Sequence, residues 1–412
     1  MKTHKLERLV EKLEPWLVGV MILYFLDINT HPLIVKAMKP GSYGILAILI
    51  SFRWKRFVYI ATRDIPLLLF AGMSAASILW SASPTFTGNE YKAAIRGTLL
   101  GIYLATRFSM KEQMRLWTWV LGIGAVLSLV LSLALPSYGI KNVVVGIYRF
   151  KNLAACIQTL TAILFLLVAL TNRKYRWVAL IIFSIAIVLL LLSQGKTAYS
   201  IFVISLCLLP LYKVLNQKYK LRIALLLPLL VVSGSAIVLI ISNVEFIVVD
   251  TLGKNLEFNG RMPIWTLILD KVYERPWLGY GASGFWSSEH ALYVINHSWG
   301  GDRNTIGIGE GTTRFNSHNG YLDLLLQYGF VGLSLYVFNW LSVFFRLVTL
   351  LASTGTIECF WMLLTQISLF FFNLSDNIGL LGQSSLWSFY VAVAFSTALQ
   401  HERIRKLQFA KT

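Results

Sequence analysis

Charged residues are scarce in this chain. Asp, Glu, Lys and Arg make up 14% of its 412 positions, whereas apolar residues make up 56%. The mean hydropathy is +0.65. A soluble protein of this composition would have too little polar surface to cover itself. The composition therefore excludes an ordinary soluble globular protein and predicts a polytopic membrane protein.

Cysteine is also rare, and the apolar runs lack the alternation that is typical of strands. Cys156, Cys207 and Cys359 all lie inside apolar runs, which indicates small buried hydrophobic side chains and no disulfide framework. Because the runs are continuous, helices are expected rather than a barrel. The first apolar run lacks a small-residue cleavage site, so we expect a retained helix rather than a signal peptide.

Acidic residues are fewer than basic ones, 19 against 37, which gives a net charge of +18. The basic residues cluster at the ends of apolar runs, so nucleic acid is not an expected partner. No acidic pair has the spacing of a metal site, and no cofactor is expected. An internal repeat is not evident either, which weighs against a transporter built from inverted halves.

The apolar runs predict an all-α fold of about twelve transmembrane helices. Their expected cores are residues 15–28, 42–52, 65–80, 93–108, 116–135, 153–170, 178–192, 198–212, 223–241, 330–345, 359–372 and 380–399. On the side of the N-terminus the connecting segments hold 23 basic residues, and the short loops on the opposite side hold seven. Both termini are therefore expected in the cytoplasm. In a bacterium this topology corresponds to a multi-pass protein of the inner membrane.

One long polar segment, residues 243–317, interrupts the apolar pattern and is expected in the periplasm. We expect residues 1–242 to form the first nine helices, 243–329 a loop domain with an interfacial helix over 318–328, and 330–412 the last three helices and a cytoplasmic tail. Within the loop, residues 261–273 have helical spacing, and Pro276 with the glycines after it predicts a turn.

Two of the polar motifs on the outward side lie at helix ends. Arg149, Lys151 and Asn152 open the sixth span, where two cations and an amide at a helix N-terminus favour anion binding. Lys196 lies in the short turn SQGKT, close to the headgroup level. Basic residues at such places can also simply extend to lipid headgroups.

Two further motifs lie in or beside the loop. Arg261 opens the loop helix, and His318 and Asn319 belong to the sequence SHNG that ends the loop. The alternative roles are an ordinary solvated arginine for Arg261 and a structural histidine for His318. Arg96 within the fourth span is an additional candidate, because a charge at that depth is costly unless it lines a polar cavity.

These residues lie in motifs that carry a resemblance. GRMPIW, RPWLGYGASGFW and SHNGYLDLLLQYGFVGL follow one another, after YRFKNLAA and LLLSQGKTAYS upstream. Together they resemble the O-antigen ligase and polymerase superfamily of bacterial envelope enzymes, and within it the exopolysaccharide polymerisation (ExoQ-like, Wzy-type) branch. The resemblance covers residues 145–335 by motif and the whole chain by topology.

The resemblance implies a helical fold of the GT-C type, without a metal or a nucleotide-sugar site. Such enzymes take an oligosaccharide on an undecaprenyl diphosphate carrier and join its reducing-end sugar to a hydroxyl of a glycan or lipid-linked acceptor. By motif position, Arg261 matches the family's loop arginine and His318 its proposed base. Lys196 lies where ligases commonly have arginine, which favours the polymerase branch.

The implied chemistry suits the residue types. A diphosphate leaving group needs its charge neutralised, and the candidate cations are Arg261, Lys196, Lys151, Arg149 and Arg96. The attacking hydroxyl must lose a proton, which His318 can accept in a single displacement with inversion. Asp27, at the outer end of the first span, is the alternative base.

Binding of sugar or acceptor is assigned to Trp286, Tyr321, Asn319 and Asn152, for which packing within the protein is the alternative role. Membrane lipids and a chain-length regulator are further candidate partners. Two other functions stay open: a ligase that transfers glycan to lipid A core, and a polysaccharide transporter. A transporter should carry charges along its midplane and broken helices in matched halves, whereas the polar groups here gather on one face and one loop.

Overall fold

The computed structural model describes residues 2–29, 32–135, 143–215, 261–298, 315–378, 380–381 and 384–409. The ninth expected span (223–241) and residues 243–260 and 299–314 of the long loop lie outside the described residues. Apart from an isolated bridge between Ile28 and Tyr148, the regular structure of the described residues is helical. The expected all-α membrane fold is confirmed.

The elements agree closely with the predicted spans. In chain order they are α1 (Lys2–Phe25), α2 (Pro32–Phe52), α3 (Trp54–Ala61), α4 (Ile65–Ala76), η1 (Ser77–Leu79), α5 (Pro84–Arg107), α6 (Met110–Ala134), α7 (Lys151–Thr171), η2 (Arg173–Tyr175), α8 (Arg176–Leu192), α9 (Lys196–Cys207), α10 (Leu209–Leu215), α12 (Arg261–Glu274), α13 (His290–Asn296), α14 (Gly320–Thr354), α15 (Ile357–Ser375) and α16 (Ser385–Phe409). Each expected span in the described ranges falls on a helix. The second helix is longer than its expected core.

Local sequence signals set several helix ends. The Asp64 carboxylate accepts a hydrogen bond from Leu67 N (3.2 Å) and caps α4. Ser109 and Glu112 form a capping box at the start of α6. Pro84 occupies the first turn of α5, and Gly355, with φ of 62°, ends α14 in the left-handed conformation.

Length and composition support membrane crossing for part of the bundle. Within the described residues, six helices are long and apolar enough to span a membrane, or up to seven if the bent pair α3 and α4 with η1 counts as one span. Helices α1, α5 and α16 have the length but carry more polar residues. The number of about twelve spans therefore stays a prediction.

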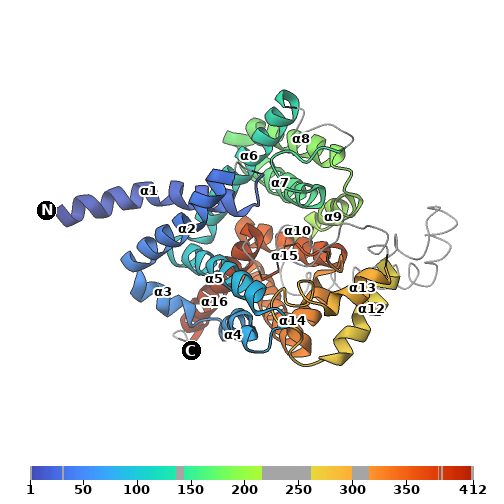
Figure 1. Ribbon diagram of the computed structural model, residues 1–412. Coiled ribbons are helices and arrows are strands. Elements are labelled where there is room, and N and C mark those ends of the chain that lie inside the picture. Colours follow the sequence, from blue (N-terminus) through green and yellow to red (C-terminus); the bar gives the residue numbers. More distant parts are fainter. Residues whose placement is uncertain are drawn as a thin grey trace.

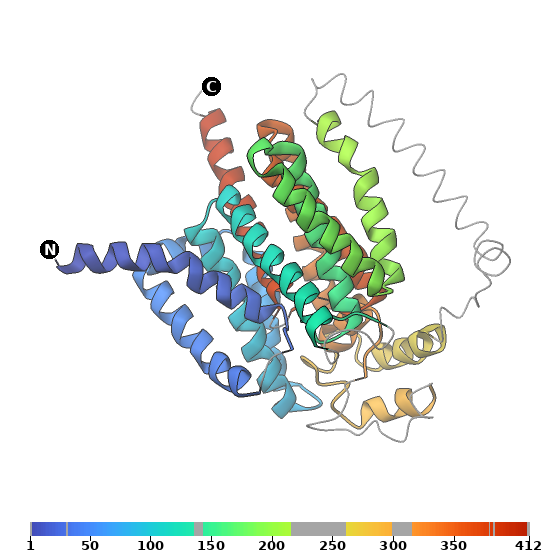
Figure 2. The ribbon, with the colours of Figure 1, turned by 90° about the horizontal axis from the view of Figure 1, so that it is seen from above.

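The last helices form the centre of the bundle. Helix α16 packs along α5, and α14 packs against α15, α4 and α16. Figure 1 shows α14 to α16, in orange and red, between the blue N-terminal helices and the green group α6 to α9. In Figure 2, α12 and α13 lie together at one end of the bundle and the C-terminus lies at the other. Most of the long bundle helices therefore end near the loop on one side.

The loop segment has an apolar core of its own. Ile264, Ile268 and Val272 of α12 are at most 1% exposed and pack with residues of α13 and with Leu325 and Leu326 of α14. The helical stripe predicted for residues 261–273 is thus confirmed. Because the first turns of α14 belong to this core, the loop is joined rigidly to the bundle.

The predicted boundary between an interfacial helix and the tenth span appears as a break within α14. Gly329 has φ of 61° and ψ of −165°. The loop supplies hydrogen bonds at the break, since Phe330 N donates to Pro276 O (2.7 Å) and Tyr280 N donates to Leu326 O (2.8 Å). The helix before the break therefore begins at Gly320, two residues later than expected, and the tenth span follows directly after Gly329.

Gly329→Ala should destabilise the protein. A Cβ at this position would lie 2.3 Å from the carbonyl carbon of Trp277, and a φ of 61° with a ψ of −165° is a conformation that costs a non-glycine residue roughly 1–3 kcal/mol. We expect a lower unfolding temperature in detergent. Gly72→Ala is the matched control, because its Cβ would meet nothing within 4 Å and alanine favours a helix interior. Equal unfolding temperatures for the two variants would contradict this account.

The topology predicts which cysteines an impermeant maleimide can reach. In a Cys207→Ser background, which removes the exposed native thiol, a cysteine at the exposed Glu289 should react from outside intact spheroplasts. A cysteine at the exposed Arg173, at the opposite end of the bundle, should react after permeabilisation. Reversal of the two results would invert the predicted orientation.

Candidate functional site

His318 lies in a tight turn at the start of α14. Its φ is 51°, and its backbone N donates to Asn316 Oδ1 at 2.8 Å. The Ser317 hydroxyl donates to Asn319 O (2.6 Å), and the Asn319 side chain caps α14 by accepting from Tyr321 N (3.0 Å). These bonds set the direction of the His318 ring, since a non-glycine residue adopts a positive φ only when its surroundings enforce it.

The imidazole faces a carboxylate from the connection between α15 and α16. His318 Nδ1 lies 3.9 Å from Asp376 Oδ1. Asp376 is 7% exposed, and its Oδ2 accepts from Asn152 Nδ2 at 2.6 Å. Arg261, the first residue of α12, lies close enough for electrostatic interaction with both His318 and Asp376. Four elements thus bring Asn152, Arg261, His318 and Asp376 together.

Burial and charge set the protonation of this cluster. Burial lowers the pKa of His318 below its ordinary value, the Asp376 carboxylate opposes this shift, and Arg261 adds to it. Burial also lowers the pKa of Arg261, and Asp376 raises it. A guanidinium stays protonated despite such a shift, so the cluster combines a cation with an imidazole that is neutral at neutral pH.

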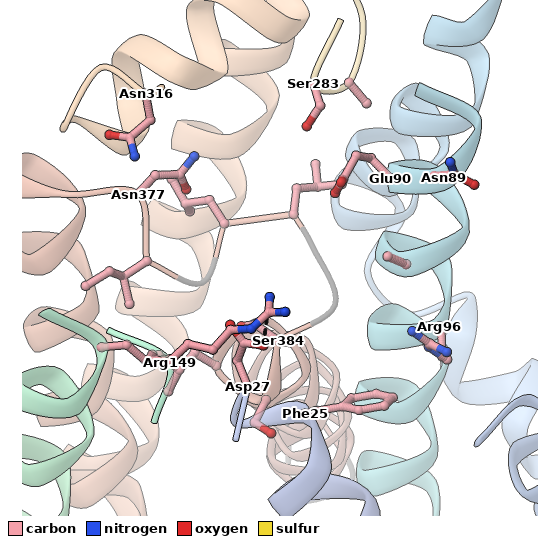
Figure 3. A pocket seen from close by; sticks show the side chains of 18 of the residues that line it. Phe25, Asp27, Asn89, Glu90, Arg96, Arg149, Ser283, Asn316, Asn377 and Ser384 are labelled. Carbon is pink, nitrogen blue, oxygen red and sulfur yellow. Dashed lines mark ion pairs between the residues drawn. The ribbon is translucent and has the colours of Figure 1, made fainter. Parts of the chain in front are cut away.

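A cavity of about 1060 Å³, lined by polar and apolar side chains, opens beside this cluster. Asn316 and Asn377, the chain neighbours of the cluster, line it together with Trp286 and Arg149. Figure 3 shows Asn316 and Asn377 on one side and Arg96, from α5, across the cavity. The cavity walls therefore combine amide, aromatic, basic, acidic and aliphatic side chains.

The predicted diphosphate ligands form two groups, those that line the cavity and those that do not. Arg149 and Arg96 line it: Arg149 Nη1 lies 3.6 Å from Asp27 Oδ1, and Arg96 Nη1 donates to Lys39 O (2.9 Å) and Ser42 Oγ (3.1 Å).

Lys151 and Lys196, both exposed, are the first residues of α7 and α9. These helix starts lie side by side, because a Cβ at Gly195 would come within 2.5 Å of Ala155 Cβ. Since Asn152 of α7 binds Asp376, Lys151 and Lys196 are on the His318 side of the site.

The residues predicted to bind sugar have different surroundings. Trp286 lines the cavity while its Nε1 donates to Asp323 Oδ1 (2.9 Å). Asn319 caps α14, Asn152 holds Asp376, and the Tyr321 hydroxyl donates to Phe370 O at 3.0 Å. Of these four residues, Trp286 is the one that lines the cavity.

Asp376 is the residue that sequence reasoning missed. It lies in the polar sequence LSDN, which separates two apolar runs on the expected outward side. That position was the one sequence feature that could have indicated a site residue. Asp27, the alternative base, also lines the cavity and pairs with Arg149. His290 and His297 stack on Tyr280 and Tyr293 in the loop.

Comparison with known families identifies the central part of the chain. The family model described as O-antigen ligase matches residues 143–337. These residues form an O-antigen ligase domain. The O-antigen ligase and polymerase superfamily expected from the motifs is thereby confirmed, and it indicates a glycosyltransferase-like enzyme of lipid-linked oligosaccharides. A search of curated proteins finds no match to this chain.

The matched range holds most of the site of this O-antigen ligase domain. It includes Asn152, Lys196, Arg261 and His318, whereas Asp376 comes from a later part of the chain. Folding of the chain is therefore needed to bring the Asp376 carboxylate beside His318.

The two charges beside His318 should move its titration in opposite directions. Asp376→Asn removes the charge that raises the pKa of His318, so the ring should lose its proton at lower pH. Arg261→Gln removes a charge that lowers the pKa, so the ring should titrate at higher pH. NMR of labelled histidine, assigned with His318→Gln, measures both shifts. The exposed His297 is the control. If neither substitution changed the pH at which His318 titrates, the result would contradict this geometry.

Proposed function

We propose that this protein is a polysaccharide polymerase of the Wzy type, which joins undecaprenyl-diphosphate-linked oligosaccharide units to a glycan acceptor on the periplasmic side of the inner membrane. The meeting of Arg261, His318, Asp376 and Asn152 supports this proposal best. It combines a cation for a diphosphate with a neutral imidazole for a hydroxyl proton. The cavity beside the cluster has room for an oligosaccharide, and its walls offer polar groups and aromatic faces.

His318 is the proposed general base. Its Nδ1 faces Asp376, which favours the tautomer with the proton on Nδ1 and leaves Nε2 to accept a proton. The acceptor oxygen forms a bond to the anomeric carbon of the donor while its proton passes to Nε2. The bond from that carbon to the diphosphate oxygen breaks, and the configuration inverts. No metal is required in this step.

The leaving diphosphate takes the electron pair of the broken bond, and cations stabilise its charge. Arg261 is next to His318, and Lys151 and Lys196 begin two helices on the same side. The free amides of these helix starts add to their charge. Arg149 and Arg96 line the cavity, where they are placed to hold the acceptor side of the complex.

Loss of His318 should abolish transfer and leave donor binding intact. His318→Ala should lower the single-turnover rate by roughly 100- to 10,000-fold, the usual cost of removing a general base. Arg261→Lys should also lower the rate, because lysine keeps the charge but lacks the planar guanidinium that binds phosphate through two N–H groups. Lys196→Arg should lower the rate only slightly. The measurement uses purified protein and a lipid-linked donor, with donor binding followed separately.

Two controls sharpen this test. His297→Ala removes an exposed loop histidine and should leave the rate unchanged. Asp27→Asn tests the alternative base. If His318→Ala kept most of its rate while Asp27→Asn lost it, the base would be Asp27 and the assignment to His318 would be wrong.

A ligase is the second candidate function, and the description of the matching family favours it. Both reactions use the same donor and the same base, so the acceptor distinguishes them. A polymerase converts lipid-linked donor alone into a ladder of longer lipid-linked glycans. A ligase leaves the donor unextended and transfers it to added lipid A core.

A further inference from the structure

Arginines gather at the end of the bundle opposite the candidate site, around the short helix α3. Arg53 Nε and Nη2 donate to Glu14 at 3.0 Å and 3.1 Å, and Arg107 donates to the same carboxylate. The Tyr103 hydroxyl is a further donor. Glu14 is 1% exposed, and its negative charge is paired inside the protein with Arg53 and Arg107.

Two more arginines extend this cluster to the surface. Arg56 of α3 and Arg403 of α16 are exposed, and Arg56 is within electrostatic range of Arg403, Arg53 and Arg107. In the described part of the chain, neither Arg56 nor Arg403 forms an ion pair with a carboxylate. Among the described side chains, Glu14 is one carboxylate among four guanidinium groups, so this cluster keeps a positive charge.

The next carboxylate along α16 does not offset this charge. Glu402 pairs with Arg63 at 3.0 Å and with Lys406 at 2.8 Å. An anion from outside the protein would therefore find Arg56 and Arg403 as exposed guanidinium partners. Guanidinium groups bind phosphate through paired N–H donors.

The geometry of α3 places this charge beside an apolar surface. The helix is bent by 97° from the segment Ile65–Leu79, so it lies across the direction of α4. Phe57 and Ile60 are buried beneath it, whereas Trp54 is 57%, Val58 53% and Tyr59 44% exposed. A helix that exposes tryptophan, tyrosine and basic residues in this way is typical of the membrane interface.

We propose that this corner binds a phospholipid with an anionic headgroup. The phosphate lies between Arg56 and Arg403, and the acyl chains contact Trp54 and Val58. The exposed apolar side chains beside the arginines favour a lipid over a free phosphate ion. The site is at the opposite end of the bundle from His318, so the inference does not depend on the proposed reaction.

Native mass spectrometry of the purified full-length protein tests this site. The protein is titrated with phosphatidylglycerol and, in parallel, with neutral phosphatidylcholine. Arg56→Gln with Arg403→Gln should weaken phosphatidylglycerol binding by about fivefold for each charge removed, as expected for basic residues near an anionic headgroup. Phosphatidylcholine binding should not change. The effect should diminish as ionic strength rises.

Matched variants separate this site from general charge. Arg173→Gln with Lys174→Gln removes two exposed cations at the same end of the bundle and should leave phosphatidylglycerol binding unchanged. Arg56→Lys with Arg403→Lys keeps the charge and should retain binding, which also shows that the positions tolerate substitution. Equal losses in the Arg173 and Arg56 pairs would overturn the proposal. So would full competition by inorganic phosphate, which would indicate an ion site without a lipid.

Discussion

Asp323 is a buried carboxylate in the first turn of α14, 1% exposed, and three segments donate hydrogen bonds to it. Trp286 Nε1 (2.9 Å) comes from the loop, Ser317 N (3.3 Å) from the turn before His318, and Asn377 Nδ2 (3.0 Å) from the connection beside Asp376. Hydrogen bonds to a charged group contribute about 1.5–3 kcal/mol each. This one carboxylate therefore holds the histidine turn, the aspartate connection and a cavity wall in a common geometry.

The break at Gly329 makes this arrangement compatible with a membrane helix. In a continuous helix, the backbone N–H and C=O groups form hydrogen bonds with one another. The positive φ of Gly329 interrupts this pattern, and the segment around Pro276 and Tyr280 forms hydrogen bonds with the backbone groups that are left. The loop is thereby bonded to α14 through its backbone as well as through its apolar core. Chemistry at the end of a bundle needs such support, because a site on an unsupported loop would lose its geometry.

Separation of the cations follows from the same architecture. Arg261, Lys151 and Lys196 lie on the side of His318 and do not line the cavity, whereas Arg96 and Arg149 line it. An enzyme that joins two large substrates needs one site for the leaving group and another for the incoming glycan, on either side of its base. The positive corner around Arg56 is at the far end of the bundle, where membrane lipid is the available anion.

The sequence by itself determined the membrane class, the helical fold, the position of nearly every described helix and the superfamily, because these depend on hydrophobic length and local motifs. His318 and Arg261 could be named from motifs, as could the break near Gly329. The tertiary structure decided that Asp376 faces His318 and that Arg96 and Arg149 line the cavity whereas Arg261 does not. Asp376 is 58 positions from His318, and no periodic pattern links residues so far apart in a chain. Long-range packing, set by the hydrogen bonds of Asp323 and the contacts of α14 with α15, brings them together.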